Sequence, residues 1–138
     1  MSASENAVRH LFVIQFYKTK KHSTMKNFMF IFRSGSDAMK MSPEESQQNM
    51  QQWFSWIGDL QSKGIYKAGE ALMPTGKTVK KGNVVTDGPY AESKEMVGGF
   101  FIINAASIEE ASEIAKGCPD LPQGGTVEVR DVVVFDNM

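Results

Sequence analysis

Cysteine is nearly absent from the chain, since Cys118 is the single one among 138 residues. One thiol can form neither an internal disulfide nor a multi-thiolate metal site, so we expect a protein of the reducing cytoplasm. Charge of one sign is lacking too, with 15 Lys and Arg against 16 Asp and Glu. Without a strong field to attract phosphates or acidic lipid, neither nucleic acid nor a membrane is an expected partner.

The sequence also lacks an apolar run of the roughly 20 residues that a membrane-spanning helix needs. The apolar stretch over residues 10–17 is too short, and the basic stretch behind it replaces the cleavage site of a signal peptide. We expect residues 1–24 to be an extension, in which residues 10–17 either add a peripheral strand or lie outside the fold. Residues 25–138 have the length of one domain.

Motifs for several kinds of site are missing as well. The chain has no Gly-rich phosphate loop before a helix, no His and carboxylate spacing for a metal, and no Gly-x-Ser-x-Gly nucleophile signal. We therefore expect no metal and no cofactor.

Apolar residues are present in short runs that predict strands. Residues 28–32, 99–104 and 132–135 are apolar at consecutive positions, which is typical of strands covered on both faces. Residues 65–72 predict another strand, whose glycine marks a bulge or a close backbone approach. Residues 126–130 alternate and begin the final strand, which we expect to continue through residue 135.

Two Ser-x-x-Glu capping boxes, at Ser42 and Ser107, predict the starts of two helices. Gly64 and Gly117 are placed to end them. The first helix has apolar residues at spacings of three and four, which we expect to face the core. These are Met50, Trp53, Ile57 and Leu60, flanked by Phe54 and Trp56.

Residues 78–81 and 84–86 flank the turn pair Gly82-Asn83 and predict a tight hairpin. The resulting order, β-α-β, hairpin, β-α-β, is an α+β ferredoxin-like pattern with an elaborated middle connection. Two helices cover only one face of the sheet, although its strands are apolar on both. A second copy of the sheet is the simplest cover, so we expect a homodimer.

The most unusual string runs from Asp87 to Glu95 and reads Asp-Gly-Pro-Tyr-Ala-Glu-Ser-Lys-Glu. Asp-Gly-Pro is typical of a turn in which the Asp side chain bonds to downstream amides. Alternatively, Asp87 is partly buried near Tyr90, Glu92 and Lys94, where a carboxylate would suit proton transfer. A third interpretation is that Asp87 only orients a ligand.

This string and four later motifs resemble the YCII-related family, in its DGPF subgroup. The later motifs are Gly98-Gly-Phe, Glu110-Ala, Gly117-Cys-Pro and Gly125-Thr-Val-Glu-Val-Arg. Tyr90 stands where the subgroup usually has Phe. The resemblance implies a dimeric α/β-barrel of ferredoxin-like protomers, similar in fold to muconolactone isomerase, with a cleft as the candidate active site.

The resemblance also implies a catalytic pair that this chain cannot form. YCII-type members pair an aspartate with a histidine near the start of the first helix, and this chain has no histidine after His22. Only Asp87 has a counterpart, while His10 and His22 are expected to be solvated. Since family domains are sometimes joined to sigma-factor-like regions, a regulatory protein is also a candidate partner.

Two functions therefore stay open. The first, favoured by the missing histidine, is a dimeric protein that binds a small organic ligand. The alternative is an isomerase- or lyase-like enzyme with Asp87 as general acid or base and Tyr90 as hydrogen-bond donor. Trp53, Trp56 and Cys118 are expected to be structural. The candidate ligand-binding residues are Arg33, Glu70, Gly88, Pro89, Glu92 and Lys94.

Overall fold

The computed structural model of the chain describes residues 24–35, 37, 40–89 and 96–136. The extra strand considered for residues 10–17 lies outside these residues. Among the described residues, no helix combines the length and apolar character that crossing a bilayer requires. The elements follow in the order β1 (Lys26–Arg33), α2 (Pro43–Ser62), β2 (Tyr66–Ala71), β3 (Lys77–Lys80), β4 (Val84–Asp87), β5 (Val97–Ala105), α3 (Ile108–Ala115), the 3-10 helix η2 (Leu121–Gln123) and β6 (Thr126–Asp131).

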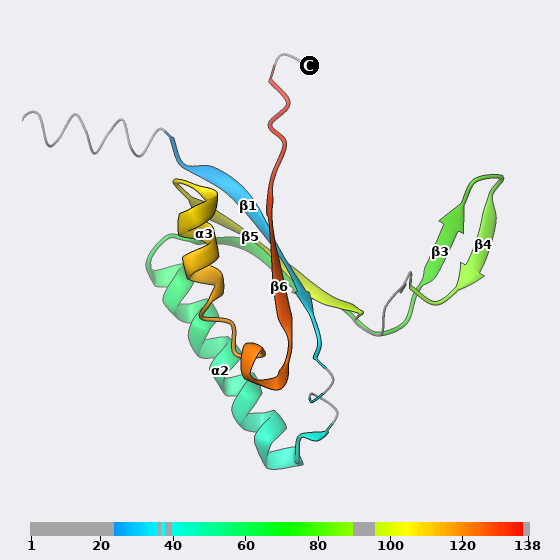
Figure 1. The fold of residues 1–138 in the computed structure, drawn as a ribbon, viewed down its shortest axis with the longest axis horizontal. Helices are drawn as coiled ribbons and strands as arrows, with labels where there is room; N and C mark the ends of the chain where they lie inside the picture. Colours follow the sequence, from blue (N-terminus) through cyan, green and yellow to red (C-terminus); the bar gives the residue numbers. More distant parts are fainter. Residues whose placement is uncertain (1–23, 36, 38–39, 90–95, 137–138) are drawn as a thin grey trace, which may run out of the picture.

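Four of the strands form one antiparallel sheet in the order β2-β5-β1-β6. Both helices pack on one side of it (Figure 1). The central strands, β1 and β5, contain two of the three consecutive apolar runs. This order, with a helix in each β-α-β unit, is the ferredoxin-like arrangement, so the predicted α+β class is confirmed.

Both helices start at the predicted caps. Ser42 Oγ accepts a hydrogen bond from the Glu45 backbone N–H at 3.2 Å, and Ser107 Oγ accepts from Glu110 N–H at 3.1 Å. Each serine thereby satisfies an N–H group that the helix itself leaves unpaired. Behind α2, Gly64 turns the chain with a φ of 70°, the left-handed conformation that favours glycine.

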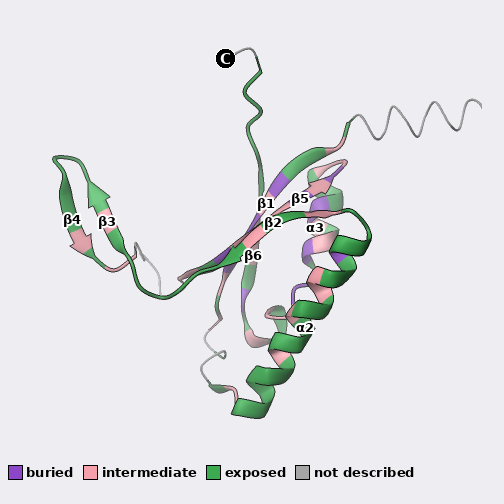
Figure 2. Ribbon diagram, turned by 180° about the vertical axis from the view of Figure 1, so that it is seen from behind, coloured by how far each residue is buried: buried purple, intermediate pink, exposed green. Residues whose placement is uncertain are grey.

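The core between helices and sheet is mainly aromatic. Phe28, Phe30 and Phe32 alternate along β1 and point toward the helices, where each is buried. The Phe30 and Trp56 rings stack with centroids 6.4 Å apart, and Phe32 meets Phe101 edge-on at 4.7 Å. In Figure 2 the buried positions gather on β1, β5 and α3, whereas much of α2 stays exposed.

The expectation that the whole apolar stripe of α2 faces the core is wrong at its first turns. Leu60 is buried and Ile57 and Trp53 are half-buried, but Met50 is 58% and Phe54 67% exposed. The amino-terminal turns of α2 extend past the end of the sheet (Figure 1). Side chains there border a cavity instead.

The final strand is shorter than expected. It ends at Asp131, and residues 132–135 are exposed, with Val133 at 68% and Phe135 at 70%. The neighbouring strand β1 begins at Lys26. The last backbone hydrogen bond between the two segments therefore runs from Val132 N–H to Asn27 O, at 3.3 Å. Beyond that bond the described residues provide no neighbouring strand for pairing, and the segment runs away from the sheet (Figure 1).

Strands β3 and β4 form the predicted hairpin as a separate two-stranded sheet that stands clear of the helices (Figure 1). Its last pair is Lys80 with Val84, so the turn holds three residues rather than the expected two. Gly82 and Asn83 both have positive φ, 81° and 60°, as residues at such turns commonly do. Val79 and Val85 are 68% and 55% exposed on this arm.

Candidate functional site

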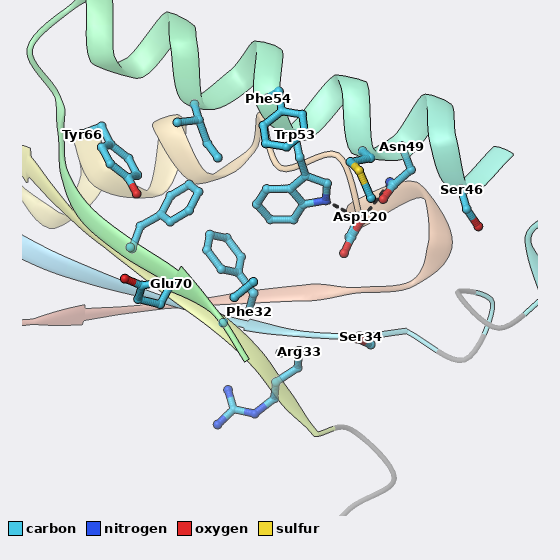
Figure 3. A pocket seen from close by; sticks show the side chains of 17 residues that line it. Phe32, Arg33, Ser34, Ser46, Asn49, Trp53, Phe54, Tyr66, Glu70 and Asp120 are labelled. Carbon is cyan, nitrogen blue, oxygen red and sulfur yellow. Dashed lines mark hydrogen bonds between the residues drawn. The ribbon is translucent and has the colours of Figure 1, made fainter. Parts of the chain in front are cut away.

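A cavity of about 490 Å³ lies between the amino-terminal half of α2 and the adjoining ends of the sheet strands (Figure 3). Its volume is in the range that holds a small organic molecule, roughly 300–1,000 Å³. The residues come from α2, from β1, β2 and β5, and from the loop behind α3. They are Phe32, Arg33, Ser34, Ser46, Asn49, Met50, Trp53, Phe54, Ile57, Tyr66, Gly69, Glu70, Ala71, Gly98, Gly99, Phe101 and Asp120.

Aromatic rings form the inner wall of the cavity. Trp53 meets Phe32 edge-on with centroids 5.0 Å apart and Phe101 at 5.9 Å. Tyr66 also packs edge-on against Phe101, with ring centroids 5.0 Å apart. Trp53 was expected to be structural. Its ring packs against the core and also forms part of the cavity wall.

Asp120 supplies a carboxylate at the inner end of the cavity. Its Oδ1 accepts hydrogen bonds from Asn49 Nδ2 and from Trp53 Nε1, each at 2.9 Å (Figure 3). The sequence analysis missed Asp120, because its partners lie 71 and 67 residues away and no local motif marks it. A weak signal was available, since Asn49 and Trp53 share a helix face four residues apart and need an acceptor where they meet.

Two predicted ligand-binding residues, Arg33 and Glu70, do line the cavity. Arg33 Nη1 donates to Glu128 Oε1 at 2.7 Å, and Arg130 Nη1 donates to Glu128 Oε2 at 3.1 Å. The Arg33 guanidinium first, and then that of Arg130, lowers the pKa of Glu128. The positive charge of Arg33 is therefore paired with a carboxylate of the protein, whereas Glu70 makes no ion pair with any described residue.

Asp87 lies elsewhere, at the base of the hairpin. Its side chain is 95% exposed, and its Oδ1 accepts from Lys77 Nζ at 2.7 Å. Gly88 has a φ of 87° and donates its N–H to Gly76 O at 2.7 Å, while its carbonyl accepts from Thr78 Oγ1 at 3.0 Å. Pro89 also packs near Gly76. This geometry closes the hairpin, and the acid–base role of Asp87 stays a prediction.

The structure does not describe Tyr90, Glu92 and Lys94, so their predicted roles lie outside the described residues. Among those that are described, no group of His, Cys, Asp and Glu side chains is placed to hold a metal ion. Cys118 is buried, as expected of a structural thiol, and burial raises the pKa of its thiol to about 11.

Gly69 forms part of the floor of the cavity and leaves no room for a side chain. A Cβ there would lie 2.6 Å from Phe101 Cδ1, 2.7 Å from Tyr66 Oη and 2.8 Å from the Phe100 carbonyl oxygen. The glycine therefore allows the close backbone approach that the sequence predicted. A register shift between β2 and β5 lies just before it.

Replacing this glycine tests the packing of the floor. Gly69→Ala should lower the free energy of unfolding by about 1–3 kcal/mol, because the methyl group forces the two rings or the backbone to move. Gly58→Ala is the matched control, since nothing lies within 4 Å of a Cβ at this helical position. It should instead stabilise by about 0.5–1 kcal/mol. Urea unfolding of both variants decides, and a stabilised Gly69→Ala would contradict the packing.

Two comparisons with known proteins bear on this site. The family described as the YCII-related domain matches residues 25–136. The chain is also similar to an uncharacterized protein of Rhizobium meliloti (strain 1021), with 40% identity over 53 residues, or 38% of this chain and 43% of that protein. The aligned part thus spans less than half of that relative, and the DGPF subgroup stays a prediction. Because the family match covers most of its length, the chain belongs to the YCII-related domain family.

Proposed function

We propose that the protein is a homodimer that binds a small organic molecule in the cavity between α2 and the sheet. The observation that carries the binding role is the cavity itself, in which a wall of aromatic rings surrounds the hydrogen-bonded carboxylate of Asp120. An apolar pocket with a few oriented polar groups is the usual form of a small-molecule site. The exposed rim residues Met50 and Phe54 support it further, because a ligand would cover them.

The helix-free face of the sheet supports the dimer. Met29 and Ile31 on β1 and Phe100 and Ile102 on β5 alternate with the buried residues and therefore point away from the helices. Neither of the two described α-helices covers any of these four apolar side chains. A second copy of the same face would cover them, and it would also offer a surface for the exposed residues 132–135.

A charge in this face tests the dimer. Sedimentation at micromolar concentration should give about twice the 15.3 kDa chain mass for the wild type and the chain mass for Ile31→Asp. Phe54→Asp is the control, because Phe54 is exposed on the helix side and should leave the dimer intact. Circular dichroism confirms that both variants fold. A monomeric wild type, or a dimer that survives Ile31→Asp, would contradict the dimer.

A fragment library tests the cavity. Trp53 and Trp56 are the two tryptophans of the chain, and only the former lines the cavity. Fragments that bind should shift the indole N–H resonance of Trp53 and leave that of Trp56 nearly unmoved. Ser46→Phe places a ring at the cavity wall and should abolish these shifts, whereas Ser55→Phe, on the same helix but outside the cavity, should keep them. A library without any such fragment rules the binding role out.

The isomerase- or lyase-like alternative with Asp87 and Tyr90 stays a prediction, as do a regulatory protein partner and a cytoplasmic location. The described contacts of Asp87 do not favour the enzyme, because they consist of a lysine on the hairpin and open solvent.

A further inference from the structure

We propose that the ligand of this cavity is an organic cation, an ammonium group carried on a small apolar or aromatic body. This inference rests on the proposed binding function and names its ligand class. Three features of the cavity lead to it: the charge of the side chains that face it, the free oxygen of Asp120, and the aromatic rings beside Asp120.

The charges that line the cavity favour a cation. Asp120 is the carboxylate on the helix side of the cavity. Glu70 pairs with Phe100, and Arg33 binds Glu128, the β6 partner of Ile31, so both side chains point to the helix-free face. A cationic ligand therefore finds a carboxylate without an ionic partner among the described residues, whereas an anionic ligand would meet a like charge.

Asp120 is oriented to receive a donor. Asn49 and Trp53 both bind Oδ1, which holds the carboxylate in place and leaves Oδ2 without a partner among the described residues. An ammonium group has N–H donors and no acceptor, so it matches an oxygen that still has unused lone pairs. A carboxylate or phosphate ligand would instead bring a second negative charge against it.

The rings beside Asp120 add a second attraction for a cation. Trp53 is bonded to Asp120, and Phe32 packs edge-on against Trp53 (Figure 3). The faces of such rings carry partial negative charge and attract ammonium and guanidinium groups. Phe54 at the rim is 67% exposed and can close over the apolar body of the ligand.

The field of α2 is the one feature that opposes a cation, because the amino terminus of a helix carries partial positive charge. In this chain the first turn contains Glu44 and Glu45, and Ser42 already accepts the Glu45 N–H. The local carboxylates and the cap therefore offset this end, and the carboxylate of Asp120 decides the sign.

Three small molecules that share one ring test the ligand class: benzylamine, benzyl alcohol and benzoate, which are cationic, neutral and anionic at pH 7. Each is titrated into the wild-type protein while the indole N–H resonances of Trp53 and Trp56 are followed by NMR. Benzylamine should bind with a Kd at least tenfold lower than that of benzyl alcohol, and benzoate should bind more weakly than either. Equal or tighter binding of benzoate or benzyl alcohol overturns the proposal.

Charge-removing variants locate the effect. Asp120→Asn keeps the shape and an acceptor for Trp53, so it should reduce the preference for benzylamine over benzyl alcohol at least fivefold. Glu70→Gln should leave the preference unchanged, because the Glu70 side chain points to the helix-free face. The comparison of the three molecules on the wild-type protein decides if Asp120→Asn fails to fold. Asp59→Asn is the matched control, since Asp59 lies on α2 outside the cavity, 52% exposed and paired with Lys63. A control that loses as much affinity as Asp120→Asn would contradict a local contact.

The outcomes also separate this inference from the proposed function. If benzyl alcohol or benzoate moves the Trp53 resonance and benzylamine does not, the cavity binds small molecules and the cation class is wrong. If none of the three moves it, the cation class is wrong again, and the fragment library decides the binding function independently.

Discussion

Phe30→Ala is expected to lower the free energy of unfolding by about 3–5 kcal/mol, the range for truncating a large buried aromatic side chain. Phe30 is 0% exposed at the centre of β1, stacks on Trp56 at 6.4 Å and meets Phe32 edge-on at 6.2 Å. Its loss leaves a cavity that neighbours on both the helix and the sheet cannot fill. Urea unfolding measures this loss. The slope of the free energy of unfolding against urea concentration should be the same for the wild type and the variant.

Phe54→Ala is the control for this substitution, because it removes the same atoms from a side chain that is 67% exposed. It should change the free energy of unfolding by about 0.5 kcal/mol or less, as surface substitutions usually do. If the two variants lose similar free energies of unfolding, α2 packs against the sheet with another face than the one that the structure shows.

The fold was predictable because its main signals are local. The serines Ser42 and Ser107 cap their helices within three residues of sequence, and the apolar run over residues 28–32 marks β1 without reference to any other strand. Once these elements are placed in order, the ferredoxin-like sheet is the simplest antiparallel solution.

The errors occur where a local pattern depends on distant geometry. Helical periodicity predicts which face of α2 is apolar, but it cannot reveal that α2 runs past the end of the sheet or that Met50 is 58% exposed. Residues 132–135 read as a covered strand, yet strand formation needs a neighbouring strand, and β1 begins at Lys26. The apolar composition of residues 132–135 does not reveal where the neighbouring strand begins.

The candidate site was only partly predictable for the same reason. Arg33 and Glu70 were recognised because each is a charged residue beside apolar residues of a strand, and both line the cavity. Asp120 was missed because its contacts with Asn49 and Trp53 join segments about half the chain apart. The hairpin places Asp87, the most prominent residue in the sequence, away from this cavity.

Trp53→Ala is expected to lower the free energy of unfolding by about 3–5 kcal/mol, because the indole fills space between Phe32 and Phe101 and also binds Asp120. Ser42→Ala, which removes only the cap of the same helix, should lower it by about 1 kcal/mol. Guanidinium unfolding compares them. Equal, small losses would mean that the indole contributes little to the core.

Trp53→Phe separates the ring from its hydrogen bond. Phenylalanine keeps an aromatic ring beside Phe32 and Phe101 but has no N–H for Asp120, so about 1.5 kcal/mol should be lost, the lower limit for a hydrogen bond to a charged group. Asn49 still binds Oδ1 in this variant, which keeps the loss near that limit. A double-mutant cycle with Asp120→Ala, which removes the acceptor, should give a coupling energy of about 0.5–1.5 kcal/mol. Strict additivity of the two substitutions would show that the bond contributes nothing to stability and that the loss comes from ring packing alone.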